Sequence, residues 1–302
     1  MSTTAPPRSS QGGSSRWILL ATDLSCRCDR AQDRAALLAE QWGARLAVLH
    51  VLEAEPSDVP SWRGPSAAAR IAERRIRADI ADRRVEWEVI LDHGEPAAAI
   101  LRQAVERGCD LIVTGIARDR MLAPAILGTT VDWLVRRTPV PVLVVKCRPH
   151  RPYAELVVAT DFSEPSRHAL ESALRLFPEA HFTLFHAFRV PFEGLIDRDV
   201  HRDEFRATAT AECADFLSRV QAPPAAFARM TSVIEFGSPA ELLCAYIQDR
   251  PVDLVVLGTQ GRSGLPGFLL GSTAELLLTL LPCDVMMVRG PTPLPAAAAG
   301  GD

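Results

Sequence analysis

The chain has 302 residues, of which 48% are hydrophobic and 23% are charged, and its formal net charge is −4. This composition excludes a disordered chain and allows two packed domains of ordinary size. The slightly acidic balance argues against a nucleic-acid partner, and no apolar run approaches the roughly 20 residues needed to cross a membrane.

Short apolar runs and amphipathic stretches alternate along both halves of the chain. In the first half the predicted strands are 17–22, 45–52, 86–91, 111–115 and 142–146, and the predicted helices are 29–41, 66–83, 96–106 and 130–137. In the second half the predicted strands are 155–160, 181–187, 231–236, 254–258 and 284–288, and the predicted helices are 165–176, 202–220, 240–249 and 272–281. This alternation predicts an α/β fold of two tandem doubly wound domains, each with a parallel sheet covered by helices on both faces.

The two ends of the chain differ in composition from the rest. Residues 1–15 are rich in Ser, Gly and Pro, and residues 291–302 are rich in Pro, Ala and Gly, so both are predicted to be disordered tails. The first stretch lacks the apolar core of a signal peptide, and the seven cysteines have no disulfide-framework spacing. Both observations favour a cytoplasmic location.

The second half of the chain repeats the first. Two stretches carry the repeat: ILLATDLS at 18–25 returns as LVVATDFS at 156–163, and DLIVTG at 110–115 returns as DLVVLG at 253–258. A repeat of this length predicts two homologous domains, at residues 16–150 and 151–290. The second copy is slightly longer, and we place its extra residues near 188–203.

A spaced set of glycines follows the fourth predicted strand of the second copy. Gly258 and Gly261 come directly after the apolar run, and Gly271 and Ser272 precede the next predicted helix. Glycine lets a ligand approach bare backbone N–H groups, and a helix N-terminus adds unpaired donors and the positive end of its dipole. The spacing predicts a phosphate-binding loop, although a flexible loop without a ligand has the same glycine content.

Asp161 follows the first predicted strand of the second copy. In doubly wound sheets, ligands bind beyond the carboxyl ends of the strands at the switch in strand order. If the first and fourth strands flank that switch, Asp161 and the glycine loop share one crevice, where a carboxylate suits a nucleoside hydroxyl or amine. The alternative is a turn or helix-cap role, because Ser163 and Pro165 follow.

These motifs resemble those of the universal stress protein family, in a tandem arrangement. The similarity lies in the opening VVATDFS at 157–163 and in the pattern Gly, two residues, Gly, nine residues, Gly-Ser at 258–272, and it covers residues 16–290. The resemblance implies five strands per domain in the order 3-2-1-4-5. It also implies a bound adenine nucleotide, with ATP favoured over ADP or AMP and with or without Mg²⁺.

The resemblance further implies which residues hold the nucleotide. Asp161, His186 and Ala187 would face the base or ribose, and the glycine loop with Ser272 and Thr273 would hold the phosphates. From the residues alone, His50 and His186 at the ends of buried strands are alternatively hydrogen-bonding residues that hold their neighbours in position. Arg262 either contacts the terminal phosphates or lies in solvent. The expected nucleotide-binding residues are Ala159, Thr160, Asp161, His186, Ala187, Gly258, Thr259, Gly261, Arg262, Gly271, Ser272 and Thr273.

The first copy departs from the glycine pattern at one position. Arg118 stands where the second copy has Gly261. A side chain in a left-handed backbone costs roughly 1–2 kcal/mol and also occupies space. We therefore predict a degenerate site without tight nucleotide binding, unless Arg118 itself pairs with the anion. The degenerate site consists of Asp23, Gly115, Arg118, Gly128 and Thr129.

Each copy ends in an apolar strand, at 142–146 and 284–288, which the strand order places at a sheet edge. Exposed apolar edges promote aggregation. The two edges are therefore expected to pair across a pseudo-twofold axis, which makes one chain the equivalent of a dimer. Pairing of whole chains into a homodimer stays open.

Three functions are compatible with these features. A nucleotide-dependent regulatory or stress-tolerance module that acts on an unknown protein partner is favoured. A slow ATP hydrolase or phosphotransferase is the second. Against it, Gly271 is followed directly by Ser272 and Thr273, without the lysine of a Walker loop, and no paired carboxylates accompany the glycines. The third is a partner-binding scaffold without a physiological nucleotide.

Overall fold

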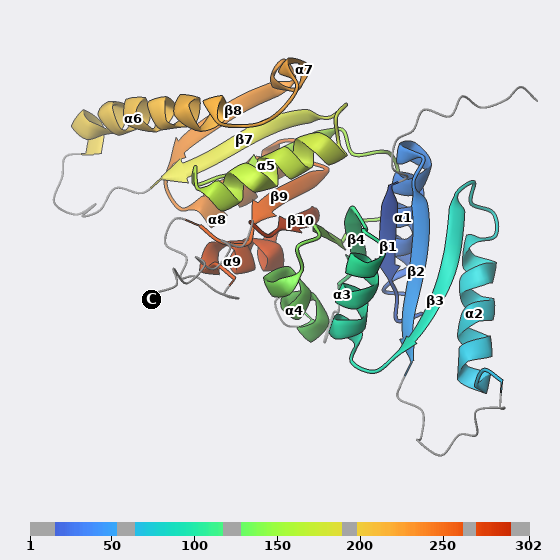
Figure 1. Cartoon of the computed structure of the whole chain (residues 1–302). Helices are drawn as coiled ribbons and strands as arrows, with labels where there is room; N and C mark the ends of the chain where they lie inside the picture. The colour runs from blue at the N-terminus through green and yellow to red at the C-terminus, as the bar shows by residue number, and fades with distance from the viewer. Residues whose placement is uncertain (1–15, 53–63, 117–127, 189–197, 262–269, 291–302) are drawn as a thin grey trace, which may run out of the picture.

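The computed structural model describes residues 16–52, 64–116, 128–188, 198–261 and 270–290. The N-terminal half contains β1 (Trp17–Ala21), α1 (Asp29–Trp42), β2 (Arg45–Leu52), α2 (Ala67–Ile80), β3 (Glu86–His93), α3 (Pro96–Glu106), β4 (Leu111–Gly115), α4 (Thr129–Arg137) and β5 (Val142–Val145). The C-terminal half contains β6 (Glu155–Ala159), α5 (Glu164–Leu176), β7 (His181–Phe188), α6 (Arg198–Ser218), α7 (Pro224–Phe227), β8 (Met230–Phe236), α8 (Pro239–Asp249), β9 (Leu254–Gly258), α9 (Ser272–Leu280) and β10 (Asp284–Val288) (Figure 1). Both halves follow the predicted alternation, and α7 is an addition that the sequence did not predict.

The strands form one continuous sheet in the order β3-β2-β1-β4-β5-β10-β9-β6-β7-β8. Strand pairs within each half are parallel, which confirms two tandem doubly wound domains with strand order 3-2-1-4-5. β5 and β10 pair antiparallel, with Val144 opposite Val285, so the two apolar fifth strands cover each other as predicted. Because this central pair is antiparallel, the carboxyl ends of the strands point to opposite edges of the sheet in the two halves.

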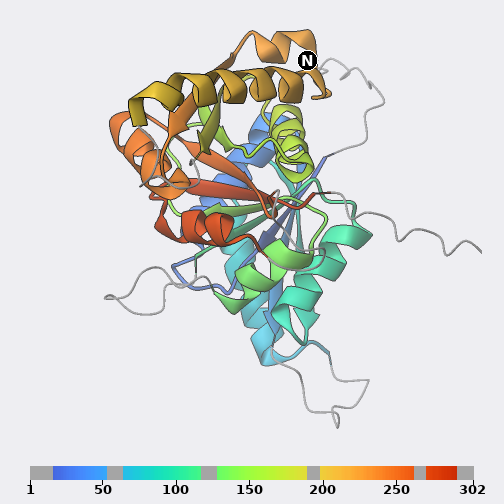
Figure 2. The same cartoon turned by 90° about the vertical axis from the view of Figure 1, so that its left-hand side faces the viewer.

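Helices cover both faces of the sheet (Figure 2). One core layer packs α1, α2, α5 and α6 against the strands, through residues that include Leu38, Ile76, Leu170 and Phe216. The other layer packs α3, α4, α8 and α9, through residues that include Ile100, Leu134, Leu243 and Leu277. Each layer contains residues of both halves, so the two repeats share their core.

The first helix of each half starts at a different distance from its first strand. Ser163 caps α5 by accepting the N–H of Ser166, and only residues 160–163 separate β6 from that helix. Cys28 precedes α1 without a side-chain cap, and residues 22–28 separate β1 from it. The N-terminal half therefore has a longer turn at the edge of the sheet where a ligand crevice is expected.

The extra length of the second copy lies mainly in its second helix. α6 has 21 residues, against 14 in α2, and α7 follows it before β8. The prediction near residues 188–203 was therefore only partly right, because much of the added length lies beyond residue 203. Of the described helices, none is long and apolar enough to span a bilayer.

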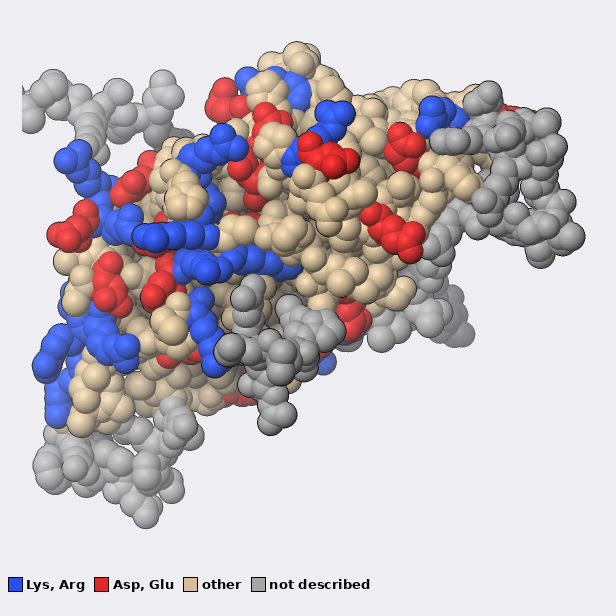
Figure 3. All heavy atoms as spheres, turned by 180° about the vertical axis from the view of Figure 1, so that it is seen from behind, with Lys and Arg blue, Asp and Glu red and all other residues tan. Residues whose placement is uncertain are grey.

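The surface of the N-terminal half carries many charges of both signs. Figure 3 shows Lys and Arg side chains interspersed with Asp and Glu side chains on the back of this half. Several of its arginines form ion pairs, as in Arg102 with Asp92 and Arg107 with Glu88, at 2.7 and 2.8 Å. In these pairs, a nearby carboxylate balances the positive charge of each arginine.

Candidate functional site

A strained turn presents Asp161 after β6. Phe162 has a left-handed backbone with φ of 61°, an uncommon conformation for a bulky residue. The Thr160 hydroxyl accepts the N–H of Phe162 at 2.9 Å and lies 2.9 Å from the Ser166 hydroxyl. Leu24 has the same conformation in the first copy, with φ of 60°. Strained residues cluster at ligand sites, so this repeated turn points to a functional constraint that the sequence analysis missed.

The His186 ring supports this turn from the face of the sheet opposite the crevice. It stacks on the buried Phe162 ring, with centroids 4.1 Å apart, and its Nδ1 lies 2.8 Å from the Thr160 carbonyl oxygen. Neighbouring residues on a strand point to opposite faces, so Ala187 faces the crevice and His186 does not. His186 was expected either to face the base or ribose or to hold its neighbours by a hydrogen bond, and its contact with Thr160 behind the turn agrees with the second role.

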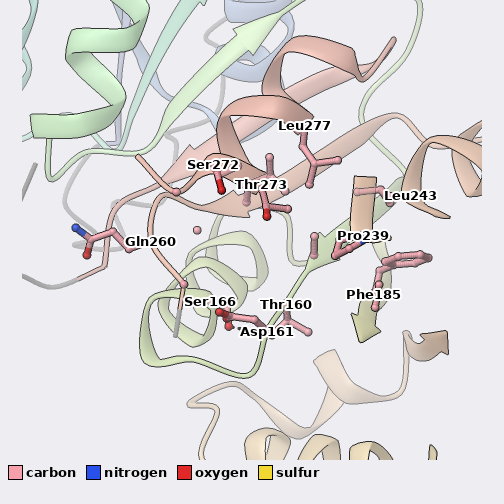
Figure 4. A pocket seen from close by; sticks show the side chains of 17 residues that line it. Thr160, Asp161, Ser166, Phe185, Pro239, Leu243, Gln260, Ser272, Thr273 and Leu277 are labelled. Carbon is pink, nitrogen blue, oxygen red and sulfur yellow. Dashed lines mark hydrogen bonds between the residues drawn. The ribbon is translucent and has the colours of Figure 1, made fainter. Parts of the chain in front are cut away.

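The turn, the glycine loop and α9 surround a cavity of about 210 Å³, the C-terminal crevice. Its walls include nine of the predicted residues: Ala159, Thr160, Asp161, Ala187, Gly258, Gly261, Gly271, Ser272 and Thr273. The residues that the sequence did not predict are Ser166, Phe185, Pro239, Leu243, Leu257, Gln260, Ala274 and Leu277. Phe185, Pro239 and Leu243 gather on one side of the cavity, and Asp161, Ser166 and Gln260 lie on the other (Figure 4). The crevice thus has an apolar and a polar part.

Two glycines of the loop lie against neighbouring groups. A Cβ at Gly261 would lie 2.6 Å from Oδ2 of Asp161, closer than real Cβ contacts, and a Cβ at Gly258 would lie 3.3 Å from the Pro165 backbone. At Gly271 the nearest atom to an added Cβ is the Thr259 carbonyl oxygen, at 3.6 Å, an ordinary contact. Gly261 is therefore the loop position where a side chain conflicts directly with the carboxylate of the crevice. Its backbone is not left-handed, so the prediction of backbone strain for a side chain at this position is wrong, and the conflict comes from lack of space.

The first turn of α9 borders the same cavity, and the first N–H groups of a helix have no partner within the helix. Gly271 precedes the helix, makes no side-chain cap, and donates its own N–H to the Thr259 carbonyl oxygen at 2.9 Å. Ser272 and Thr273 follow in the wall of the cavity. Thr259 itself is 2% exposed, so it anchors the loop from behind and does not line the crevice. Arg262 lies outside the described residues.

A second cavity, the N-terminal crevice, lies at the corresponding place in the first copy. It measures about 260 Å³, and its walls include Thr22, Asp23, His50, Gly115, Gly128 and Thr129. Arg118 lies outside the described residues. A cavity of similar size therefore persists among the described residues of the copy that we predicted to be degenerate.

The N-terminal crevice differs in its charged groups and in its entrance turn. Arg27 and Cys28 line it at the level where the second copy has Pro165 and Ser166. Burial alone would raise the pKa of Asp23, but hydrogen bonds from Ser25 and Cys28 and the charge of Arg27 hold it below its usual value. Burial raises the pKa of the Cys28 thiol to about 11, so this thiol stays protonated at neutral pH.

The described residues of the two crevices do not form a preformed metal cluster. Among the residues that the structure describes, no group of three or more His, Cys, Asp or Glu side chains is arranged to hold a metal ion. Among the described residues that line the C-terminal crevice, Asp161 is the one acidic side chain.

These features define a class of protein: a Rossmann-like α/β protein with two tandem repeats in one continuous sheet and a crevice at the strand-order switch of each repeat. The sequence model of the universal stress protein family matches residues 15–146 and 152–289. The chain belongs to this family, and it holds two copies of the domain.

Named relatives agree with this assignment. Universal stress protein E of Escherichia coli is 28% identical over 210 residues, which cover 65% of this chain and 66% of that protein, just under two thirds of its length. A universal stress protein from Archaeoglobus fulgidus has a similar fold, with a TM-score of 0.65 and 20% identity over 92% of this chain and 99% of that one. A putative universal stress protein from Pseudomonas aeruginosa has a TM-score of 0.65 and 21% identity, over 92% and 94% of the two chains.

Proposed function

We propose that the chain binds an adenine nucleotide in its C-terminal crevice, with ATP favoured over ADP and AMP. In this proposal the protein acts as a nucleotide-dependent regulatory module of the stress response. The observation that carries this proposal is the meeting of Gly261, Asp161 and the first turn of α9 around one cavity. A carboxylate and a row of backbone donors in one amphipathic crevice suit a ligand with hydroxyl groups at one point and phosphates at another.

The two parts of the crevice suggest an orientation for the nucleotide. The base would lie against the apolar side formed by Phe185, Leu243 and Leu257, and the phosphates would lie at Ser272 and Thr273. Asp161 would then accept a hydrogen bond from the ribose or the base. In this proposal His186 acts indirectly, because its ring supports the turn that carries Asp161.

We further propose that the two domains, at residues 16–150 and 151–290, are an unequal pair. Glycine at 261 leaves room for the Asp161 carboxylate, whereas the first copy has Arg118 at the corresponding position. The charge of Arg27 beside Asp23 also compensates the carboxylate that a nucleoside would use. Both differences favour nucleotide binding in the C-terminal copy.

A regulatory role is favoured over an enzymatic one by the chemistry of the crevice. Phosphoryl transfer needs a positioned base and neutralised phosphate charge, commonly with Mg²⁺. The described wall of the C-terminal crevice has one carboxylate and no lysine or histidine. A slow ATPase is the alternative, and a scaffold without nucleotide is the next. A cytoplasmic location and an unknown protein partner complete the proposal, and pairing of whole chains stays open.

Equilibrium binding of ATP to the full chain tests this function. We expect about one nucleotide per chain, with weaker binding after Asp161→Ala and after Gly261→Arg. Phosphate release under excess ATP measures hydrolysis in the same samples, and ADP and AMP in place of ATP establish the preferred nucleotide. The proposal is wrong if the chain binds no adenine nucleotide, or if Asp161→Ala leaves the affinity unchanged.

A further inference from the structure

α9 borders the C-terminal crevice at its first turn, and the other repeat contacts it both there, where Arg136 lies 3.7 Å from Glu275, and at its last turn. Its first turn contributes Ser272 and Thr273 to the crevice wall. At its last turn, Nζ of Lys146 donates to the carbonyl oxygens of Leu278 and Leu281, at 2.5 and 2.8 Å. Lys146 follows β5 directly and thus belongs to the N-terminal repeat. One short helix therefore connects a residue of the first repeat with the ligand crevice of the second.

The Lys146 contact satisfies groups that α9 cannot satisfy by itself. The last carbonyl groups of a helix have no partner within the helix, and they form the negative end of its dipole. α9 has no basic residue in its last turn, whereas α4, the equivalent helix of the first repeat, has Arg136 and Arg137. The ammonium group of Lys146, a residue only 8% exposed, supplies this charge to α9 from outside.

Lys146 is itself held in place by both repeats. Its backbone N–H donates to Oδ1 of Asp284 at 2.7 Å, and its carbonyl oxygen accepts from Arg30 at 2.6 Å. Asp284 is fully buried at the start of β10, and its Oδ2 accepts the hydroxyl of Tyr153. A buried side chain fixed at its backbone and at its head group has little freedom to move, so it can set the position of the helix end that it contacts.

We propose that Lys146 is a positioning residue for the nucleotide site of the C-terminal repeat. Its ammonium group fixes the end of α9 and complements the helix dipole, and the first turn of the same helix then presents its N–H groups to the phosphates. With nine residues, α9 spans about 13 Å, so the effect reaches the ligand through a single rigid element. This inference rests on the proposed function, and it makes the N-terminal repeat a part of the binding site.

The matching contact in the other direction provides a control. Arg289 follows β10 as Lys146 follows β5, and it donates to the carbonyl oxygen of Arg137 at the end of α4, at 2.8 Å. The N-terminus of α4 lies at the N-terminal crevice, where Thr129 is in the wall. Loss of the Arg289 side chain removes the same kind of contact from the helix that does not border the C-terminal crevice.

The test compares the affinities of the full-length wild type, Lys146→Met, Lys146→Arg and Arg289→Met for ATP and for adenosine. Adenosine lacks phosphates, so it reports on the crevice without the donors of α9. We expect Lys146→Met to weaken ATP binding by about 3- to 10-fold, the usual size of a helix-end charge effect, and to leave adenosine binding within about twofold. Lys146→Arg should keep the affinity for ATP close to that of the wild type, and Arg289→Met should change the affinity for neither ligand.

Several outcomes overturn the inference. Equal losses for ATP and adenosine in Lys146→Met would show a general loosening, as would an equal loss in Arg289→Met. An unchanged ATP affinity in Lys146→Met, with wild-type binding intact, refutes the role of Lys146 and leaves the proposed function standing. A wild type that binds no ATP refutes both. If Lys146→Met does not fold, Lys146→Gln, which keeps a donor without the charge, takes its place with the same expected losses.

Discussion

Replacement of Gly261 by alanine is the sharpest test of the C-terminal crevice. The new Cβ would lie 2.6 Å from Oδ2 of Asp161, so the carboxylate has to rotate away from its place in the wall. The conflict is with the end of a side chain and not with backbone. We therefore expect the free energy of unfolding to change by no more than about 1 kcal/mol, within the range of ordinary Gly-to-Ala effects.

The loss of ligand affinity should be larger than this change in stability. A hydrogen bond to a charged group contributes about 1.5–3 kcal/mol, so displacement of Asp161 should weaken ATP binding by about 10- to 150-fold. Isothermal titration calorimetry gives the affinity, and thermal unfolding without ligand gives the stability. Gly271→Ala is the matched control, because its Cβ makes only an ordinary contact at 3.6 Å, and its affinity should stay within about threefold of wild type.

A double substitution shows whether the effect passes through Asp161. If the new methyl group acts by moving the carboxylate, Asp161→Ala alone and Asp161→Ala with Gly261→Ala should lose the same affinity, because contacting residues are not additive. Wild-type affinity in Gly261→Ala refutes this reasoning. So does an equal loss in Gly271→Ala, which would mean that the loop tolerates no side chain at either position.

Three further predictions concern stability. Gly115→Ala should cost about 1–3 kcal/mol by denaturant unfolding, because its Cβ would lie 2.9 Å from the backbone oxygen of Arg27, and an unchanged midpoint would contradict this. Asp284→Asn should cost about 3–5 kcal/mol, because the buried Arg34, 3.6 Å from this carboxylate, loses its counter-charge and the Tyr153 hydroxyl loses a charged acceptor; a cost below about 1 kcal/mol would show that this network is unimportant. At Asp253, burial alone would raise the pKa, but hydrogen bonds from the backbone and Arg151 hold it below the ordinary 3.8, so its contribution is present above pH 3.8 and is lost as the pH falls through the lower folded value. Acid titrations of unfolding should therefore be flatter for Asp253→Asn than for the wild type, and identical slopes would refute the assignment.

The fold could be predicted from the sequence because its determinants are periodic and local. Buried strands of a parallel sheet are continuous apolar runs, and each lies next to an amphipathic helix in the chain, so β1 to β5 and β6 to β10 were predicted within a few residues. The antiparallel contact between β5 and β10 followed from their apolar edges. α7 was missed, because a helix of four residues leaves no periodic pattern.

The polar half of the C-terminal crevice was also visible in the sequence. Asp161 and the glycines sit directly at strand ends, and strand ends meet at one edge of a parallel sheet. His186 was expected at the ligand beside Ala187, although adjacent strand residues point to opposite faces. The period of the strand alone does not decide this, because the matching residues His50 and Val51 of the first copy both line the N-terminal crevice.

Three features were decided by the tertiary structure alone. The apolar side of the crevice combines Phe185 from β7 with Leu243 from α8, residues whose sequence patterns are those of ordinary core positions. The conflict between Gly261 and Asp161 joins residues 100 positions apart, and the hold of Lys146 on α9 joins the two repeats. Sequence patterns record how each segment buries its own face, whereas these contacts arise only when segments that are distant along the chain pack against one another.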